Sequence, residues 1–133
     1  MQNDFQTLTD HCQGMAEMLL IEQGEFYPFA VYLDNGGKLI PADFHYGDDF
    51  PLSQTLICNF KSYFDPQISN SKIKAYAIAF DTKVTNDVFP KSINSLAIRI
   101  VHIDSENIVT YYFPYMLSGR RIEFLKGWEE YSN

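Results

Sequence analysis

The stretch AYAIAF, residues 75 to 80, decides the fold because it alternates small and large apolar side chains. Tyr76, Ile78 and Phe80 fall on one side of an extended chain and three alanines fall on the other, which is the two-residue period of a β-strand. Small side chains let a helix approach a sheet closely, so we expect a helix over the alanine row. Residues 73 to 84 are therefore predicted to form a strand of a sheet that carries helices.

A β-hairpin is predicted on the N-terminal side of this strand. The apolar side chains of residues 26 to 33 follow the two-residue period of a strand. Asn35-Gly36 is among the strongest signals for a tight hairpin turn. The second strand of the hairpin is expected at residues 38 to 44, where Pro41 indicates a sheet edge or a bulge. The side chains expected to face the core from the first strand are Phe29, Val31 and Leu33.

Two helices are predicted from apolar residues spaced three and four apart. The first covers about residues 4 to 22 and stops at Gly24. Asn3 or Asp4 is expected to cap it. The second helix ends at Asp65-Pro66, because proline disfavours a helical conformation of the residue before it. The buried stripes are expected to be Phe5, Leu8, Cys12, Met15 and Leu19 in the first helix and Leu52, Leu56, Phe60, Tyr63 and Phe64 in the second.

Further extended segments complete the chain. They cover residues 95 to 103, residues 108 to 113 before Pro114, and residues 122 to 125 as a short sixth strand. The order is α-β-β-α-β-β-β, which excludes a doubly wound parallel sheet because strands and helices do not alternate throughout. We predict one α+β domain over residues 1 to 133, a single antiparallel sheet of five to six strands with helices packed on one face. This element order resembles that of the profilin, longin and roadblock group of folds.

The charge balance restricts the partners. Ten Lys and Arg residues against seventeen Asp and Glu residues give a net charge of −7, which repels nucleic acid and anionic membranes and attracts a basic protein. The longest apolar runs are too short to span a membrane, and the first residues lack the features of a secretory signal. We therefore predict a cytoplasmic protein with no nucleic-acid or membrane partner and no cofactor, in which Cys12 and Cys58 are reduced.

The densest polar group is the set Asp43, His45, Asp48 and Asp49, with Tyr46 between them. Carboxylates and imidazole bind a divalent metal or share acid and base roles where they converge. The alternative is that Asp48 and Asp49 stabilise the start of the second helix, because no recognised metal or nucleotide motif has this spacing. The four residues are weak metal candidates, and no catalytic residue is assigned.

Two other polar features have a structural and a functional interpretation each. His102 lies near a strand end on the face opposite Arg99 and titrates near neutral pH if it is functional, but histidines in this position are commonly half-buried or solvated. Arg120 and Arg121 can hold a carboxylate or phosphate through their forked donors. Their alternative role is to balance the nearby acids Glu123, Glu129 and Glu130.

Aromatic residues make up 16% of the chain, more than its core is expected to use. Strand alternation places some of them on a second sheet face, and an exposed aromatic patch is typical of a partner surface. With the arginine pair, the predicted binding residues are Tyr27, Tyr32, Tyr46, Tyr115, Arg120 and Arg121.

Three short motifs resemble those of a family of small, uncharacterised bacterial proteins with no assigned activity. They are GEFYPFA at residues 24 to 30 followed by Leu33-Asp34 and Gly36, the strand at residues 95 to 102, and Phe113-Pro114-Tyr115. Small acidic cytosolic proteins of this build are similar to immunity proteins, which cover the basic active surface of a toxin. The resemblance implies a protein partner of that kind.

Three functions are compatible with these observations. The first is a non-enzymatic protein-binding module, such as an immunity protein, in which an acidic face speeds the encounter with a basic partner. The second is a small metal-dependent or acid/base enzyme that uses Asp43, His45 and Asp48 or Asp49. The third is a homo-oligomeric structural module that pairs through a sheet edge or the aromatic face.

Overall fold

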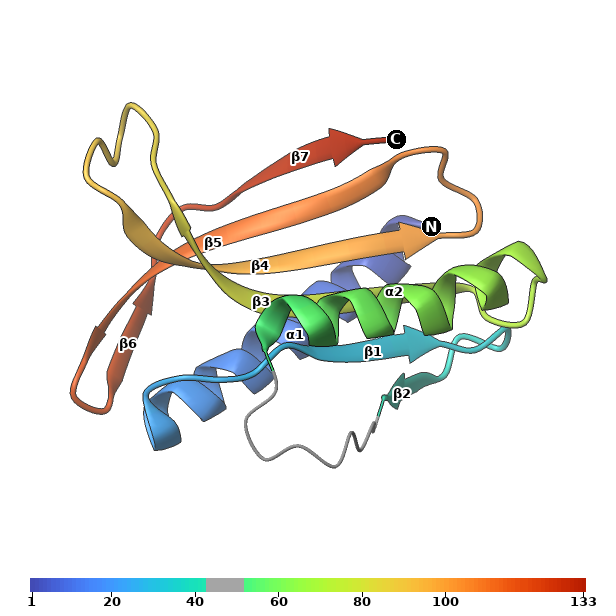
Figure 1. Cartoon of the computed structure of the whole chain (residues 1–133), viewed down its shortest axis with the longest axis horizontal. Helices are drawn as coiled ribbons and strands as arrows, with labels where there is room; N and C mark the ends of the chain where they lie inside the picture. Colours follow the sequence, from blue (N-terminus) through green and yellow to red (C-terminus); the bar gives the residue numbers. More distant parts are fainter. Residues whose placement is uncertain (43–51) are drawn as a thin grey trace.

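Strand β3 (Ala75–Val84) lies inside an antiparallel sheet and is covered on both faces. The structure is a computed structural model that describes residues 1–42 and 52–133. Its seven-stranded sheet has the order β2-β1-β3-β4-β5-β6, and β7 pairs with β5 (Figure 1). All strand pairs are antiparallel, so the predicted α+β class with a single antiparallel sheet is confirmed. The bounds are α1 (Gln2–Gln23), β1 (Phe29–Leu33), β2 (Leu39–Pro41), α2 (Ser53–Ser69), β3 (Ala75–Val84), β4 (Ile93–His102), β5 (Ile108–Ser118), β6 (Arg121–Phe124) and β7 (Trp128–Ser132).

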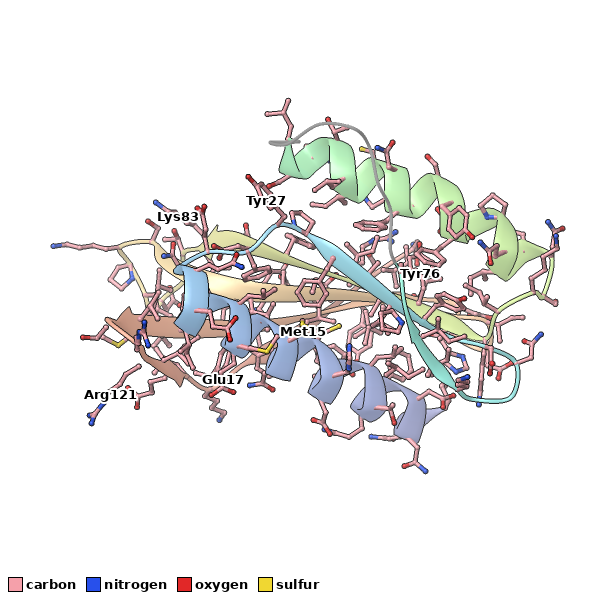
Figure 2. The ribbon with its side chains drawn as sticks, turned by 90° about the horizontal axis from the view of Figure 1, so that it is seen from below. Met15, Glu17, Tyr27, Tyr76, Lys83 and Arg121 are labelled. Carbon is pink, nitrogen blue, oxygen red and sulfur yellow. The ribbon has the colours of Figure 1, made fainter. Side chains whose placement is uncertain are left out.

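The two helices pack on opposite faces of the sheet, so the prediction that they share one face is wrong. Helix α1 covers the alanine side of β3, and α2 covers the side that carries Tyr76 and Ile78. Figures 1 and 2 show the sheet between the two helices. The physical reason is that the large side chains of β3 are as apolar as the alanines, and both rows must be removed from water.

Helix α1 approaches β3 closely, as the alanine row predicts. Ala75, Ala77 and Ala79 are fully buried against the helix. Gly24 ends α1 at a φ of 77°, and its N–H donates to the carbonyl of Leu20 at 2.9 Å, which confirms the predicted stop. The buried helix residues are Leu8, Thr9, Cys12, Ala16 and Leu20, so the buried face is turned slightly from the predicted stripe, and Leu19 is partly buried.

Helix α2 is joined to the other face by an aromatic stack and a polar chain. Phe64 stacks on Tyr76 with ring centroids 5.0 Å apart. The Tyr76 hydroxyl donates to Asp65 and accepts a hydrogen bond from Arg99 Nη1 at 3.0 Å. Burial, with Asp65 as a further cause, raises the pKa of Tyr76 and keeps the phenol neutral as a donor.

Helix α2 continues one turn past the predicted end at Asp65-Pro66, to Ser69. Pro66 lies inside the helix, where its ring removes one backbone donor, but the proline carbonyl still accepts from Asn70 N–H at 2.9 Å. Ile68 in this last turn packs against the core around Tyr76. The extra turn therefore extends the contact between α2 and the sheet.

Pro114 does not end a strand as predicted but lies inside β5. Its carbonyl accepts from Leu125 N–H at 2.7 Å on the outer side of β5. The N–H and C=O of one strand residue point to the same side, so the missing proline donor also lies on that side. There β7 pairs as far as Tyr112 and β6 begins to pair at Tyr115. Pro114 therefore lies between the part of β5 that pairs with β7 and the part that pairs with β6, where a backbone donor is least needed.

Strand β7 was missed, and its approach to β5 depends on Gly127. A Cβ at this glycine would contact the Tyr112 carbonyl oxygen and lie 2.7 Å from Cδ1 of Phe113. Only a residue without a side chain lets the backbone pass this close to β5.

We expect Gly127→Ala to destabilise the protein by about 1–3 kcal/mol, because the methyl group must push β7 away from β5. The measurement is urea unfolding followed by circular dichroism. Gly14→Ala is the matched control, since Gly14 is at an exposed position of α1 where an added Cβ meets nothing within 4 Å, and it should stabilise by about 0.5–1 kcal/mol. Equal effects of the two substitutions would contradict the close approach of Gly127.

Candidate functional site

A groove of about 870 Å³ lies between the N-terminal half of α1 and strands β5 and β7. Helix α1 packs mainly over β3 and β4, and the groove lies along its N-terminal half beside β5 and β7. The described lining residues are Met1, Gln2, Phe5, Gln6, Thr9, Asp10, Gln13, Ser105, Val109, Tyr111, Phe113, Gly127, Trp128, Glu129 and Tyr131.

Five aromatic residues line the groove. Phe5 comes from α1, and Tyr111 and Phe113 alternate along β5 with their rings stacked at 6.5 Å. Trp128 and Tyr131 come from β7, and Tyr131 is 61% exposed. The groove therefore offers flat apolar surfaces at the edge of the sheet, which is typical of partner-binding surfaces.

The groove is also acidic. Asp10 and Glu129 line it, and its described lining includes no Lys, Arg or His side chain. The Asp10 carboxylate accepts a hydrogen bond from Gln6 Nε2 at 2.7 Å, and in the described part of the chain neither acid forms an ion pair.

Glu129 contributes to a raised pKa of two tyrosines at this edge. A hydrogen bond to Glu129 raises the pKa of Tyr131. Burial and then the charge of Glu129 raise the pKa of Tyr111, which is the cross-strand neighbour of that glutamate. The groove thus holds negative potential that a cation would relieve.

One buried polar group in the groove wall lacks a partner. Thr9 is 7% exposed, and its Oγ1 atom has no hydrogen bond among the described residues. An unsatisfied buried hydroxyl costs free energy.

The residues predicted for binding do not form this groove. Tyr27 is 47% exposed in the loop before β1, while Tyr32 packs against Phe64 under α2 at 5.5 Å. Tyr115 is 4% exposed, and its hydroxyl donates to Asp81 Oδ1 at 2.9 Å. Tyr46 lies outside the described residues.

The arginine pair lies apart from the groove as well. Arg120 and Arg121 are exposed at the turn between β5 and β6. Figure 2 shows Arg121 at one end of the molecule with its side chain directed away from the ribbon. Within the described residues, neither arginine forms an ion pair with the nearby acids Glu123, Glu129 and Glu130.

The predicted metal candidates Asp43, His45, Asp48 and Asp49 all lie outside the described residues. Elsewhere in the chain, residues 1–42 and 52–133 contain no group of three His, Cys, Asp or Glu residues placed to hold a metal ion. Both cysteines are free: Cys12 is buried in the core, and Cys58 is exposed on α2.

His102 has a structural role. Its ring is fully buried, its Nδ1 accepts from Asp104 N–H at 3.0 Å, and its Nε2 lies 2.8 Å from Oδ2 of Asp4. Because Nδ1 is an acceptor, Nε2 carries the proton and donates to the carboxylate. Lys74 Nζ approaches the same oxygen at 3.1 Å. The expected cap residue Asp4 therefore joins α1 to β4 instead of capping the helix.

The pKa of Asp4 is lowered: burial acts to raise it, but the hydrogen bonds from His102 and Lys74 and the charge of Lys74 outweigh burial. The unfolded state thus binds more protons around the ordinary carboxyl pKa of 3.8, so the stabilisation is full above that pH and is lost as pH falls through the lower folded value.

Asp4→Asn should lower the free energy of unfolding by about 1–2 kcal/mol at neutral pH, and the difference from the wild type should shrink towards zero as the medium is acidified below the ordinary carboxyl pKa. Urea unfolding at a series of pH values measures this. Glu17→Gln, on the exposed side of α1, serves as control and should change stability little. A difference that stays constant down to the acid limit would refute the role of the Asp4 charge.

Sequence reasoning missed the acidic aromatic edge. The β7 sequence WEEYS lacks an apolar alternation because Trp128 and Tyr131 lie three residues apart and so on opposite faces. A weak signal existed in the two aromatic residues that flank the Glu129-Glu130 pair directly after Gly127.

Comparison with protein-family models, with curated proteins and with solved structures finds no significant match. In the described part of the chain, neither helix has the length and hydropathy needed to cross a membrane.

Proposed function

We propose that this protein is a non-enzymatic binding module whose groove between α1 and strands β5 and β7 takes a basic surface of another protein. The observation that carries the proposal is the lining of the groove: five aromatic residues, the carboxylates of Asp10 and Glu129, and no Lys, Arg or His side chain among the described residues. A net charge of −7 adds long-range attraction for such a partner.

The groove chemistry suits lysine and arginine side chains. Their aliphatic stems pack against aromatic rings while their charged ends reach a carboxylate. Tyr131 offers a ring face for cation–π contact, and Glu129 on the same face of β7 offers the counter-charge. Aromatic side chains are enriched among the residues that dominate binding energy at protein interfaces.

The resemblance to small acidic immunity proteins favours a toxin as the partner. A toxin that cleaves or modifies an anionic substrate has a basic active surface, and an acidic groove that covers this surface blocks the substrate. Complementary charge also speeds association, which an immunity protein requires to act before the toxin does.

The test is capture of partners from native extract with the tagged full-length chain, followed by the same capture with the double variant Asp10→Lys, Glu129→Lys. We expect the partner to be lost with this variant, since two attractive charges become repulsive. The bound fraction of the wild-type partner should also fall as salt is raised.

The matched control is the double variant Glu17→Lys, Glu22→Lys. It changes the net charge by the same amount on exposed parts of α1 that do not line the groove. The proposal requires that this control keep the partner. Absence of any specific partner, or equal loss with both double variants, would overturn it.

A further inference from the structure

Strand β7 forms an open edge of the sheet. It pairs with β5 on one side, from Trp128 opposite Tyr112 to Ser132 opposite Ile108. Among the described elements none pairs with its other side, and Figure 1 shows β7 along the outer border of the sheet. Such an edge presents unpaired N–H and C=O groups that can accept a further strand.

The side chains of β7 are distributed evenly between its two faces. Glu129 and Tyr131 face the groove, because their partners on β5 are Tyr111 and Val109 of the groove wall. Trp128 faces the other side and stacks on Tyr112 with centroids 5.5 Å apart. Each face of the edge therefore carries one aromatic residue and one glutamate, since Glu130 follows the same alternation as Trp128.

A second cavity lies on the face of β7 that carries Glu130. This cavity of about 290 Å³ is lined by Trp128, Glu130, Tyr112 and residues 82–86, which include Lys83. No ion pair between described residues joins Lys83 to Glu130. Burial, followed by the charge and hydrogen bond of Glu130, raises the pKa of Tyr112. Both glutamates of the edge therefore have room beside them and no cationic partner among the described side chains.

A second copy of this chain is a poor occupant of the edge. Antiparallel pairing of two β7 strands in register around the Glu129-Glu130 pair would bring glutamates of the two copies opposite each other. Like charges in directly opposed strand positions are destabilising. The same two carboxylates would pair favourably with basic residues of a foreign strand.

We propose that the partner adds an extended segment to the outer edge of β7, with an apolar residue, two consecutive basic residues and a second apolar residue opposite Tyr131, Glu130, Glu129 and Trp128. This inference rests on the proposed function and specifies the mode of docking and the chemistry of the partner. Consecutive basic residues are required because neighbouring strand residues point to opposite faces. One basic side chain enters the groove beside Glu129, and the other lies in the hollow beside Glu130.

The test uses the blocked peptide Thr-Val-Lys-Arg-Val-Thr, titrated into the full-length chain. Trp128 is the only tryptophan of the sequence, so its fluorescence reports directly on the edge. We expect saturable binding, no binding of the peptide with Glu-Glu in place of Lys-Arg, and weakened binding to the double variant Glu129→Lys, Glu130→Lys. The control variant Glu17→Lys, Glu22→Lys should bind the first peptide as the wild type does.

Backbone methylation separates strand addition from simple charge attraction. Alternate N–H groups of a strand point to one side, so we prepare two peptides N-methylated at the two alternate sets. One methylation pattern should weaken binding at least about tenfold, because it removes hydrogen bonds to β7, and the other should leave the Kd nearly unchanged.

Equal binding of both methylated peptides, or no binding of the parent peptide, would overturn strand addition. Neither result affects the capture experiment. If the native partner is lost with Asp10→Lys, Glu129→Lys while methylation has no effect, the groove binds the partner and the docking mode is wrong.

Discussion

The structure depends on the requirement that both faces of β3 be removed from water. Its alanines lie under α1 and its Tyr76 and Ile78 lie under α2, each row fully buried. One layer of helices cannot bury both apolar faces of a strand. The three-layer arrangement follows, with the sheet in the middle, and the remaining strands take their places outward from β3 on either side.

The groove is a consequence of the same packing. Alanines draw α1 close to β3, and the ion pair and hydrogen bond of Asp4 join its first turn to Lys74 and the buried His102. With its position set there, α1 packs mainly over β3 and β4, and a groove lies between its N-terminal half and strands β5 and β7. The aromatic side chains of those strands cover each other only in part. The groove is therefore lined by aromatic and acidic residues and lies beside the open edge of β7.

Much of the fold could be predicted because local patterns carry it. The alternation in residues 75–80 identified β3 and its alanine row, and Gly24 marked the end of α1. The side of the sheet that α2 covers could not be predicted, because an apolar stripe shows that a helix is buried but not against which face. Pro114 is unfavourable in a strand by local rules, and only the change of partner beside β5 makes it acceptable.

The candidate site escaped prediction for a related reason. Strand alternation predicts that Tyr27 and Tyr32 lie on the second sheet face, yet Tyr32 and Tyr115 are packed by elements distant in sequence. The groove is lined by residues from the start of α1 and from the end of the chain. Spacing rules describe neighbours in sequence and cannot predict that such distant segments meet. The composition shows that the chain is acidic and rich in aromatic residues. Only the structure shows that acidic and aromatic residues meet in the groove.

Amide hydrogen exchange of the wild-type chain, free and bound to its captured partner, tests the central claim most directly. New protection should appear in β7, Trp128–Ser132, and in the first half of α1, because those segments form the edge and the groove wall. Protection confined to α2, with exchange of β7 unchanged by the partner, would contradict the account.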